Sequence, residues 1–339
     1  MALRLGEWRG GSGMERVRIA WAGGFLALTC ALVTLLPGQD ARAGNDAEQL
    51  QLRPAPPVIG AVEHLVDVLG ETRKYVLHIP ASGVGKALPA VVVLHGHGGT
   101  PFQISQYFPF DAIAEREGFV VVYPEGQGRY WKDVRFKNQL QSDTVRAAAD
   151  VAFLNVLAAD LAAKGIADAK RIYLTGISNG GFMVTTMACL SPRRFAAFAP
   201  VIATAPVIAR ELCKGERPLP LLVMNGTSDP MTVWDAERAE KIGYLGGENF
   251  FTFWSRLNGC RGREELVLED VDDADGSRVS HISATGCRAG GDTELYRVNG
   301  GGHHPPTLEH RPAGSFRGAR NHDIEAPEVI WAFFKRFSN

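Results

Sequence analysis

Residues 171–190 read RIYLTGISNGGFMVTTMACL, and this stretch decides the fold. Residues 172–175 are apolar, aromatic or β-branched, which predicts a buried strand over 171–175, and residues 180–190 continue with a helical apolar pattern. Ser178 therefore stands on a sharp turn from strand to helix, with glycines on both sides. The backbone is strained at such a turn and neighbouring side chains would clash, so the flanking glycines are required. The helix N-terminus also favours negative charge that develops beside the serine.

Strands and helices alternate on both sides of this stretch. The predicted strands cover residues 64–69, 74–79, 90–94, 119–123, 171–175, 195–201, 220–225 and 295–299, and the predicted helices cover 110–117, 144–164, 180–190, 248–258 and 326–337. The first two strands are joined through Gly70 and read as a hairpin. The fold class is therefore α/β, with a mostly parallel sheet covered on both faces and an antiparallel hairpin at its N-terminal edge.

The composition excludes several classes of protein. The 339 residues are 45% hydrophobic and 22% charged, which excludes a disordered, collagen-like or coiled-coil chain. The formal net charge is −1, so the chain has no overall field suited to nucleic acid or to an anionic membrane surface. We therefore expect no nucleic-acid partner.

The N-terminus has the pattern of an export signal. Several arginines precede an apolar run at residues 19–36, and the tripeptide ARA at 41–43 offers the small-x-small pattern of a signal-peptidase site. We expect a signal peptide over residues 1–43, a flexible leader over 44–57 and one large domain over 58–339. The location is then secreted or periplasmic, with no stable membrane insertion after cleavage. An uncleaved anchor is the alternative, because the apolar run is just long enough to span a bilayer.

Four cysteines remain after the signal is removed. Cys189, Cys213, Cys260 and Cys287 are an even number entering an oxidising compartment, which predicts two disulfides, with four buried thiols as the alternative. Three pairings are possible, and Cys189–Cys213 with Cys260–Cys287 closes the shortest non-overlapping loops. The spacing does not contain the Cys-x-x-Cys pattern of a zinc site.

Ser178 needs partners before it can act as a nucleophile. A serine hydroxyl is a weak nucleophile at neutral pH and requires an imidazole oriented by an acid. Asp229 follows the strand predicted to end at residue 225, and His303 follows the one predicted to end at residue 299. We predict Asp229 as the acid and His303 as the base.

The alternatives to these two residues are their neighbours. His304 lies next to His303 in the same glycine-rich loop, and Asp235 is the nearest competitor of Asp229. Three more histidines lie outside any predicted strand end and are expected at the surface. These are His281, His310 and His322.

The negative oxygen formed in acyl transfer needs two N–H donors. We assign one to Asn179, the residue after the serine, and the other to His97 in the sequence HGHGG at 95–99, with Gly96 as the alternative. The side chains of His95 and His97 are expected to hold this loop. Together with His303 and His304 they lack a carboxylate at ligand spacing, so we predict no metal and no cofactor.

Two further stretches have a structural and a functional interpretation. Residues 272–276, DDADG, are similar to a calcium loop but lack the alternating ligands and the closing glutamate, so a hairpin turn is expected. Tyr130 and Trp131 lie on the side of the expected site, where they would either stack on an aromatic acyl group or polymer or belong to a packed loop.

Four motifs together carry a family resemblance. They are VVVLHGHGG at 91–99, GISNGGFM at 176–183, NGTSDP at 225–230 and GGGH at 300–303. In these motifs and their order the chain resembles the secreted polyhydroxybutyrate depolymerase and feruloyl esterase group of α/β-hydrolases, from about residue 62 to 337. The resemblance implies an α/β-hydrolase fold with Ser178 as nucleophile, Asp229 as acid and His303 as base. Cysteines placed like these four recur in the group, which supports the favoured pairing.

The resemblance implies a secreted serine esterase. The expected substrates are hydroxyacyl oligoesters of the polyhydroxybutyrate type, and the alternative is a feruloyl or acetyl esterase acting on plant polysaccharide. The group often has an aromatic residue after its histidine, where this chain has HPP at 304–306. This departure affects the expected substrate and leaves the expected chemistry unchanged. An alternative of another class is a hydrolase-fold binding protein without turnover. Among enzymes, a peptidase on the same fold is a weaker alternative, because the sequence shows no appended propeller or cap domain that would gate peptides.

Overall fold

The structure is a computed structural model, and it describes residues 62–83, 85–136, 141–311 and 316–339. The predicted signal peptide and leader lie outside the described residues. Within the described part, no helix combines the length and the apolar character needed to cross a membrane.

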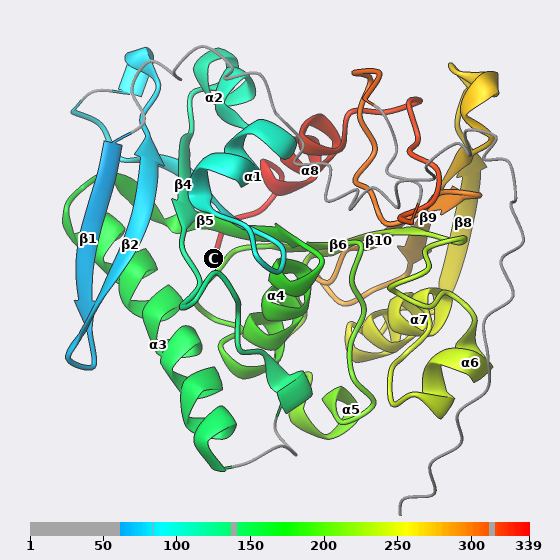
Figure 1. Cartoon of the computed structure of the whole chain (residues 1–339), viewed down its shortest axis with the longest axis horizontal. Coiled ribbons are helices and arrows are strands. Elements are labelled where there is room, and N and C mark those ends of the chain that lie inside the picture. Colours follow the sequence, from blue (N-terminus) through cyan, green and yellow to red (C-terminus); the bar gives the residue numbers. More distant parts are fainter. Residues whose placement is uncertain (1–61, 84, 137–140, 312–315) are drawn as a thin grey trace, which may run out of the picture. The chain divides into compact units, whose positions relative to one another are not determined.

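Ten strands form one sheet in the order β1-β2-β4-β3-β5-β6-β7-β10-β9-β8 (Figure 1). The strands are β1 (Val62–Val68), β2 (Glu71–His78), β3 (Leu88–Leu94), β4 (Val120–Pro124), β5 (Ala167–Ile177), β6 (Phe198–Val201), β7 (Leu221–Gly226), β8 (Gly262–Val267), β9 (Arg278–Thr285) and β10 (Thr293–Asn299). The helices are α1 (Pro101–Tyr107), α2 (Asp111–Glu117), α3 (Gln141–Ala163), α4 (Asn179–Leu190), α5 (Ala209–Leu212), α6 (Ala236–Lys241), α7 (Gly247–Leu257) and α8 (Ala326–Phe334).

The centre of the sheet is parallel and both edges are antiparallel. Strands β4, β3, β5, β6, β7 and β10 run parallel to one another. The hairpin β1–β2 pairs antiparallel to β4, so the predicted sheet with an N-terminal hairpin is confirmed. A second hairpin, β8–β9, closes the opposite edge; its turn was predicted at residues 272–276, but its two strands were not. All six residues of β8 are exposed, so its sequence carries no alternation of buried and exposed side chains.

Helices cover both faces of the sheet. Along β3, Ala90, Val92 and Leu94 face a core that includes side chains of α3, α4, α5 and α7, whereas Val91 and Val93 face a core with α1, α2 and α8. Figure 1 shows these two sets of helices on opposite sides of the sheet. The continuous apolar run of β3 is thus explained by a strand that is buried on both faces.

Three short helices escaped the sequence prediction. Helix α1 begins at Pro101 and is capped by Thr100, whose hydroxyl accepts the N–H of Gln103 at 3.2 Å. Like α5 and α6, it has seven residues or fewer, too few to display a helical apolar period. All the helices and strands that the sequence predicted are present, with ends displaced by a few residues.

Both predicted disulfides are confirmed. Cys189, at the end of α4, is bonded to Cys213, which follows α5. Cys260, which follows α7, is bonded to Cys287, which follows β9. Each bond ties the end of a helix to a segment more than twenty residues away in the sequence.

A buried ion pair joins the N-terminal hairpin to α3. The Arg73 guanidinium donates to the Asp150 carboxylate at 2.7 Å, and the two side chains are only 6% and 3% exposed. The other oxygen of Asp150 accepts the backbone N–H of Lys132 at 2.8 Å. Burial raises the pKa of Asp150, and the charge of Arg73 opposes that shift. The pair thereby fixes the loop before α3, which borders the site described below.

We predict that Arg73→Met lowers the free energy of unfolding by about 3–5 kcal/mol, because it leaves a buried carboxylate without its partner. Lys74→Met is the matched control, since the Lys74–Glu63 pair is 52% and 61% exposed and an exposed pair contributes at most about 1 kcal/mol. Urea denaturation of the two variants and the wild type measures the difference. Equal effects of the two substitutions would contradict the prediction.

Candidate active site

Ser178 lies on a strained turn between β5 and α4. Its backbone has φ 52° and ψ −120°, a conformation that a residue with a side chain rarely adopts. A Cβ atom on Gly176 would lie 2.7 Å from the Cβ of Leu94, and one on Gly180 would lie 2.5 Å from the Leu94 carbonyl oxygen. Both flanking glycines are therefore required by the packing of the turn against β3, as the sequence predicts.

The structure brings Ser178, His303 and Asp229 into one hydrogen-bonded array. The Nε2 atom of His303 lies 2.9 Å from the Ser178 Oγ, and its Nδ1 lies 2.7 Å from Asp229 Oδ2. The His303 and Asp229 side chains are 3% and 1% exposed. The second carboxylate oxygen of Asp229 accepts the backbone N–H groups of Met231 and Thr232 at 2.7 and 2.8 Å. A carboxylate held in this way orients the imidazole, so that the Nε2 lone pair faces the serine hydroxyl.

The three residues meet because each follows the carboxyl end of a parallel strand: β5, β7 and β10. The loops after β7 and β10 are also in direct backbone contact. The N–H of Ser228 donates to the Gly301 carbonyl at 2.9 Å. A Cβ atom on Gly226 would lie 2.2 Å from that same oxygen, so only glycine permits this approach.

The two neighbouring candidates have other partners. The Nδ1 of His304 contacts the Tyr107 hydroxyl at 2.9 Å and the Arg320 guanidinium at 3.0 Å. Burial, reinforced by the charge of Arg320, lowers the pKa of His304 to about 3. Asp235 caps α6, where its carboxylate accepts the N–H of Arg238 at 2.8 Å. The sequence did not indicate the Tyr107–Arg320 environment, which joins residues more than two hundred positions apart.

The loop at residues 95–99 lies directly beside the serine. A Cβ atom on Gly96 would stand 3.6 Å from the Ser178 Cβ, so the backbone of this loop borders the hydroxyl. The backbone N–H groups of Asn179 and His97 donate to no backbone carbonyl of the described residues, which leaves them available to a negative oxygen. The His97 ring is exposed and packs edge-on against Tyr130, with 4.9 Å between centroids. The choice of His97 over Gly96 as donor stays a prediction.

The Asn179 side chain holds the turn against the loop that precedes α3. Its amide oxygen accepts the backbone N–H of Trp131 at 2.7 Å, and its amide nitrogen donates to the Trp131 carbonyl at 2.9 Å and to Asp133 at 3.1 Å. This positioning role of the side chain was not foreseen from the sequence. The same loop is the one fixed by Asp150 through Lys132.

His95 and Trp131 are packing residues. The Nδ1–H of His95 donates to the Gly96 carbonyl at 2.7 Å, and its Nε2 accepts the N–H of Gly126 at 2.9 Å. Trp131 is fully buried and donates its indole N–H to the His95 carbonyl at 3.0 Å, so it belongs to a packed loop and does not face a ligand. Burial lowers the pKa of His95 to about 4, which keeps the ring neutral and both hydrogen bonds intact.

A small cavity of about 110 Å³ adjoins the array. Its walls include Phe182, whose N–H donates to the Ser178 carbonyl at 3.0 Å, and the Met231–Thr232 pair that binds Asp229. The remaining lining residues are Arg135, Thr204, Val233, Ile242 and Tyr244. This cavity is the candidate substrate pocket.

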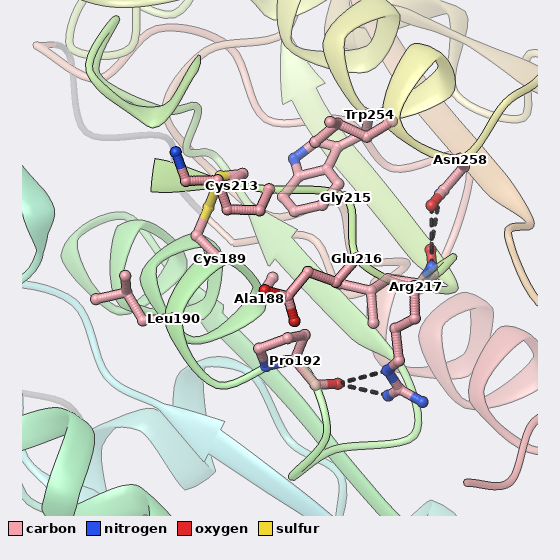
Figure 2. A pocket seen from close by; sticks show the side chains of 13 residues that line it. Ala188, Cys189, Leu190, Pro192, Cys213, Gly215, Glu216, Arg217, Trp254 and Asn258 are labelled. Carbon is pink, nitrogen blue, oxygen red and sulfur yellow. Dashed lines mark hydrogen bonds between the residues drawn. A yellow bond between two sulfur atoms is a disulfide. The ribbon is translucent and has the colours of Figure 1, made fainter. Parts of the chain in front are cut away.

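A second cavity, of about 100 Å³, lies elsewhere (Figure 2). Figure 2 shows it beside the Cys189–Cys213 disulfide, with Arg217 donating to the Pro192 carbonyl. Cys189 is near the C-terminal end of α4 and Ser178 caps its N-terminus, so roughly 15 Å of helix separates the two. This cavity therefore does not serve the serine.

The chain is similar in sequence to known esterases. The family model described as Esterase PHB depolymerase matches residues 73–246. The chain is 27% identical to feruloyl esterase B from Piromyces equi over 246 residues, which is 68% of this chain and 42% of that protein. It is 32% identical to poly(3-hydroxyalkanoate) depolymerase C from Paucimonas lemoignei over 126 residues, which is 37% of this chain and 30% of that protein. The chain thus spans less than half the length of each of these relatives.

A solved structure shows the same fold. The acetyl xylan esterase from Aspergillus awamori superposes with a TM-score of 0.51 at 15% identity, over 72% of this chain and 94% of that one. The α/β-hydrolase fold that the sequence resemblance implies is confirmed by this match and by the sheet order.

We predict that a neutral His95 makes stability depend on pH. Between pH 6.5 and pH 4 the unfolded chain binds a proton at residue 95 that the folded chain does not, so the free energy of unfolding falls as pH falls. The loss from this residue is about 2 kcal/mol between pH 7 and pH 5. His95→Gln keeps an acceptor for the Gly126 N–H but cannot titrate, so its pH dependence should be weaker by that amount. Urea denaturation at the two pH values measures it, and identical slopes for both proteins would contradict a buried neutral His95.

Proposed function

The chain belongs to the esterase PHB depolymerase family, and from this membership we propose that it hydrolyses carboxylic esters through an acyl-enzyme on Ser178. The observation that carries the proposal is the continuous array from Ser178 Oγ through His303 to Asp229, with donor–acceptor distances of 2.9 and 2.7 Å. Two available backbone N–H groups beside the serine support it.

The proposed reaction uses each residue in turn. The Ser178 oxygen attacks the ester carbonyl carbon while His303 Nε2 takes the hydroxyl proton, and Asp229 stabilises the imidazolium. The N–H groups of Asn179 and His97 hold the negative oxygen of the tetrahedral intermediate. His303 returns the proton to the departing alcohol. Water then attacks the acyl-enzyme by the same path, which releases the acid and restores the serine.

A short hydroxyacyl group is the proposed substrate. The cavity of about 110 Å³ is well below the roughly 300–1,000 Å³ typical of pockets for drug-sized ligands, so it fits one small acyl unit. Apolar side chains such as Phe182 and Met231 would face the carbon chain. The Thr232 hydroxyl donates to the Ile202 carbonyl at 3.1 Å, so its oxygen would serve only as an acceptor for a hydroxyl substituent. The likeness to a poly(3-hydroxyalkanoate) depolymerase supports a substrate of this class. The proposed substrate is therefore a 3-hydroxybutyrate-type oligoester.

Feruloyl or acetyl esters are the second candidate. They are favoured by the relative named feruloyl esterase B, whose match covers 68% of this chain. A hydrolase-fold binding protein without turnover is the alternative of another class, and the experiment below distinguishes all three.

We also propose that the protein is exported, with residues 1–43 removed as a signal peptide and residues 58–339 as the catalytic domain. Two disulfides support this proposal, because such bonds persist in oxidising compartments. The proposed location is secreted or periplasmic.

We predict that Asp229→Asn lowers kcat by about 10⁴-fold, because the imidazole loses the partner that fixes its tautomer. Ser178→Ala should lose covalent labelling by a fluorophosphonate probe and all turnover above the blank. Asp235→Asn is the matched control, since this exposed carboxylate caps α6 and should leave kcat unchanged. Loss of activity in Asp235→Asn, or its retention in Ser178→Ala, would contradict the assignment.

The substrate is tested with the same preparations. Initial rates on a 3-hydroxybutyrate trimer and on methyl ferulate are measured in parallel, with Ser178→Ala as blank. We expect the higher kcat/KM on the trimer. The reverse order would make the protein a feruloyl esterase. Rates equal to the blank on both, with Ser178 unlabelled by the probe, would favour the binding protein.

A further inference from the structure

Three metal-ligating side chains meet away from the serine. Asp272, His310 and His322 each place one ligand atom so that all three atoms lie within 4.8 Å of one another. The Oδ2 atom of Asp272 is 3.5 Å from His310 Nδ1 and 3.3 Å from His322 Nδ1. We propose that these residues bind a structural Zn²⁺ ion, with water as the fourth ligand.

His322 is the strongest sign of a missing partner. The sequence analysis expected this residue at the surface, and that expectation is wrong, because its side chain is only 11% exposed. Neither ring nitrogen has a hydrogen-bond partner among the described residues. A buried polar atom without a partner is costly and rare. The carboxylates of Asp272 and Asp275 lie 3.3 and 3.6 Å from Nδ1 without forming a hydrogen bond, and a metal ion bound to Nδ1 would satisfy this nitrogen directly.

The distances fit a shared ion better than direct contact. Separations of 3.3 and 3.5 Å between imidazole nitrogen and carboxylate oxygen exceed the usual 2.7–2.9 Å of a charge-assisted hydrogen bond. Zinc binds nitrogen and oxygen at about 2.0–2.2 Å, so two ligands of a tetrahedral ion lie about 3.3–3.6 Å apart. Small side-chain rotations would complete the set with His310.

The ligand types select the metal. Two imidazoles and one carboxylate suit Zn²⁺, whereas Ca²⁺ and Mg²⁺ prefer oxygen ligands alone. Residues 272–276, which are similar in sequence to a calcium loop, lie in the turn between β8 and β9 and include a short 3₁₀ helix at Asp273–Asp275. Of these residues, only Asp272 contributes a ligand atom to the site.

The frame of the site is already in place. The Asp323 carboxylate accepts the backbone N–H groups of Val271 and Asp272 at 2.8 and 3.2 Å. The Asp275 carboxylate accepts the backbone N–H of His322 at 2.7 Å. Two of the three ligands are thus positioned by backbone hydrogen bonds to buried or half-buried carboxylates, and the ion would need to order only His310, whose side chain is 76% exposed.

The ion would stabilise the segment at residues 317–319, which is hydrogen-bonded to the loop of His303. The backbone N–H of His303 donates to the Arg317 carbonyl at 2.6 Å, and that of Gly302 donates to the Ala319 carbonyl at 2.8 Å. The strip at residues 317–319 lies between ligands His310 and His322 in the sequence. Binding both ligands to the β8–β9 turn would hold this strip from two sides. The proposed role is stabilisation of the histidine loop, independent of the chemistry at Ser178.

The test measures zinc binding and melting temperature on purified protein stripped with EDTA. Calorimetric titration with Zn²⁺ should show one ion per chain. A Zn²⁺ concentration about 100-fold above Kd should raise Tm by about 5 °C, since a ligand bound only by the folded state stabilises it. His310→Ala, at an exposed position, should weaken binding at least about tenfold and reduce the rise in Tm at the same Zn²⁺ concentration to about half or less.

Two adjacent carboxylates of the turn supply a second test variant and its matched control. Asp272→Asn removes the ligand charge but keeps the oxygen that accepts the Ala274 N–H, and it should behave like His310→Ala. Asp273→Asn removes an exposed carboxylate of the same turn and should bind zinc like the wild type. Absence of zinc binding, or a Kd and a Tm rise in His310→Ala equal to those of the wild type, would overturn the proposal.

Discussion

The strained turn at Ser178 is the constraint on which the structure depends. A non-glycine residue at positive φ costs about 1–3 kcal/mol and persists only where its surroundings enforce it. Here the enforcement comes from both neighbouring strands. The N–H of Ser178 donates to the Val201 carbonyl of β6 at 3.0 Å, and a Cβ atom on Gly181 would lie 2.6 Å from that of Ala203. Helix α4 is therefore pressed so closely against the sheet that only glycine fits at the contacts, and the serine has one available orientation.

The rest of the site is fastened to that turn by backbone contacts. The loops of Asp229 and His303 touch through glycine, and the loop before α3 is bound to the turn by the Asn179 amide. The Asp150 carboxylate accepts a backbone N–H of this last loop and is paired with Arg73 of β2. The turn of Ser178 is thus supported by the buried polar side chains of Asn179 and Asp150, and the loops of Asp229 and His303 are supported by their glycine contacts. The precision of the site depends on these supports as much as on the array itself.

Sequence reasoning succeeded where a local pattern determines the structure. Strands β3, β4 and β7 are largely apolar runs, and the turn around Ser178 carries its own glycine signature. The centre of the sheet and the meeting of Ser178 with Asp229 and His303 could therefore be anticipated. It failed where the decisive contact is distant in sequence. The burial of His322 depends on a hairpin whose first strand is entirely exposed and so has no apolar pattern. No sequence pattern near His304 predicts that its Nδ1 contacts Tyr107 and Arg320.

The exposed strand β8 affects whether the sheet can pair with another copy of the chain. This strand lies at the end of the sheet, so one row of its backbone N–H and C=O groups has no neighbouring strand within the described part of the chain. Such a row can pair with a strand of another chain and start aggregation. Arg263, Glu264 and Glu265 stand on this strand, and all its side chains face solvent. A second chain docking along residues 263–265 would have to dehydrate those charges, which opposes intermolecular pairing at this part of the edge, whereas Leu266 and Val267 beyond them are exposed apolar side chains.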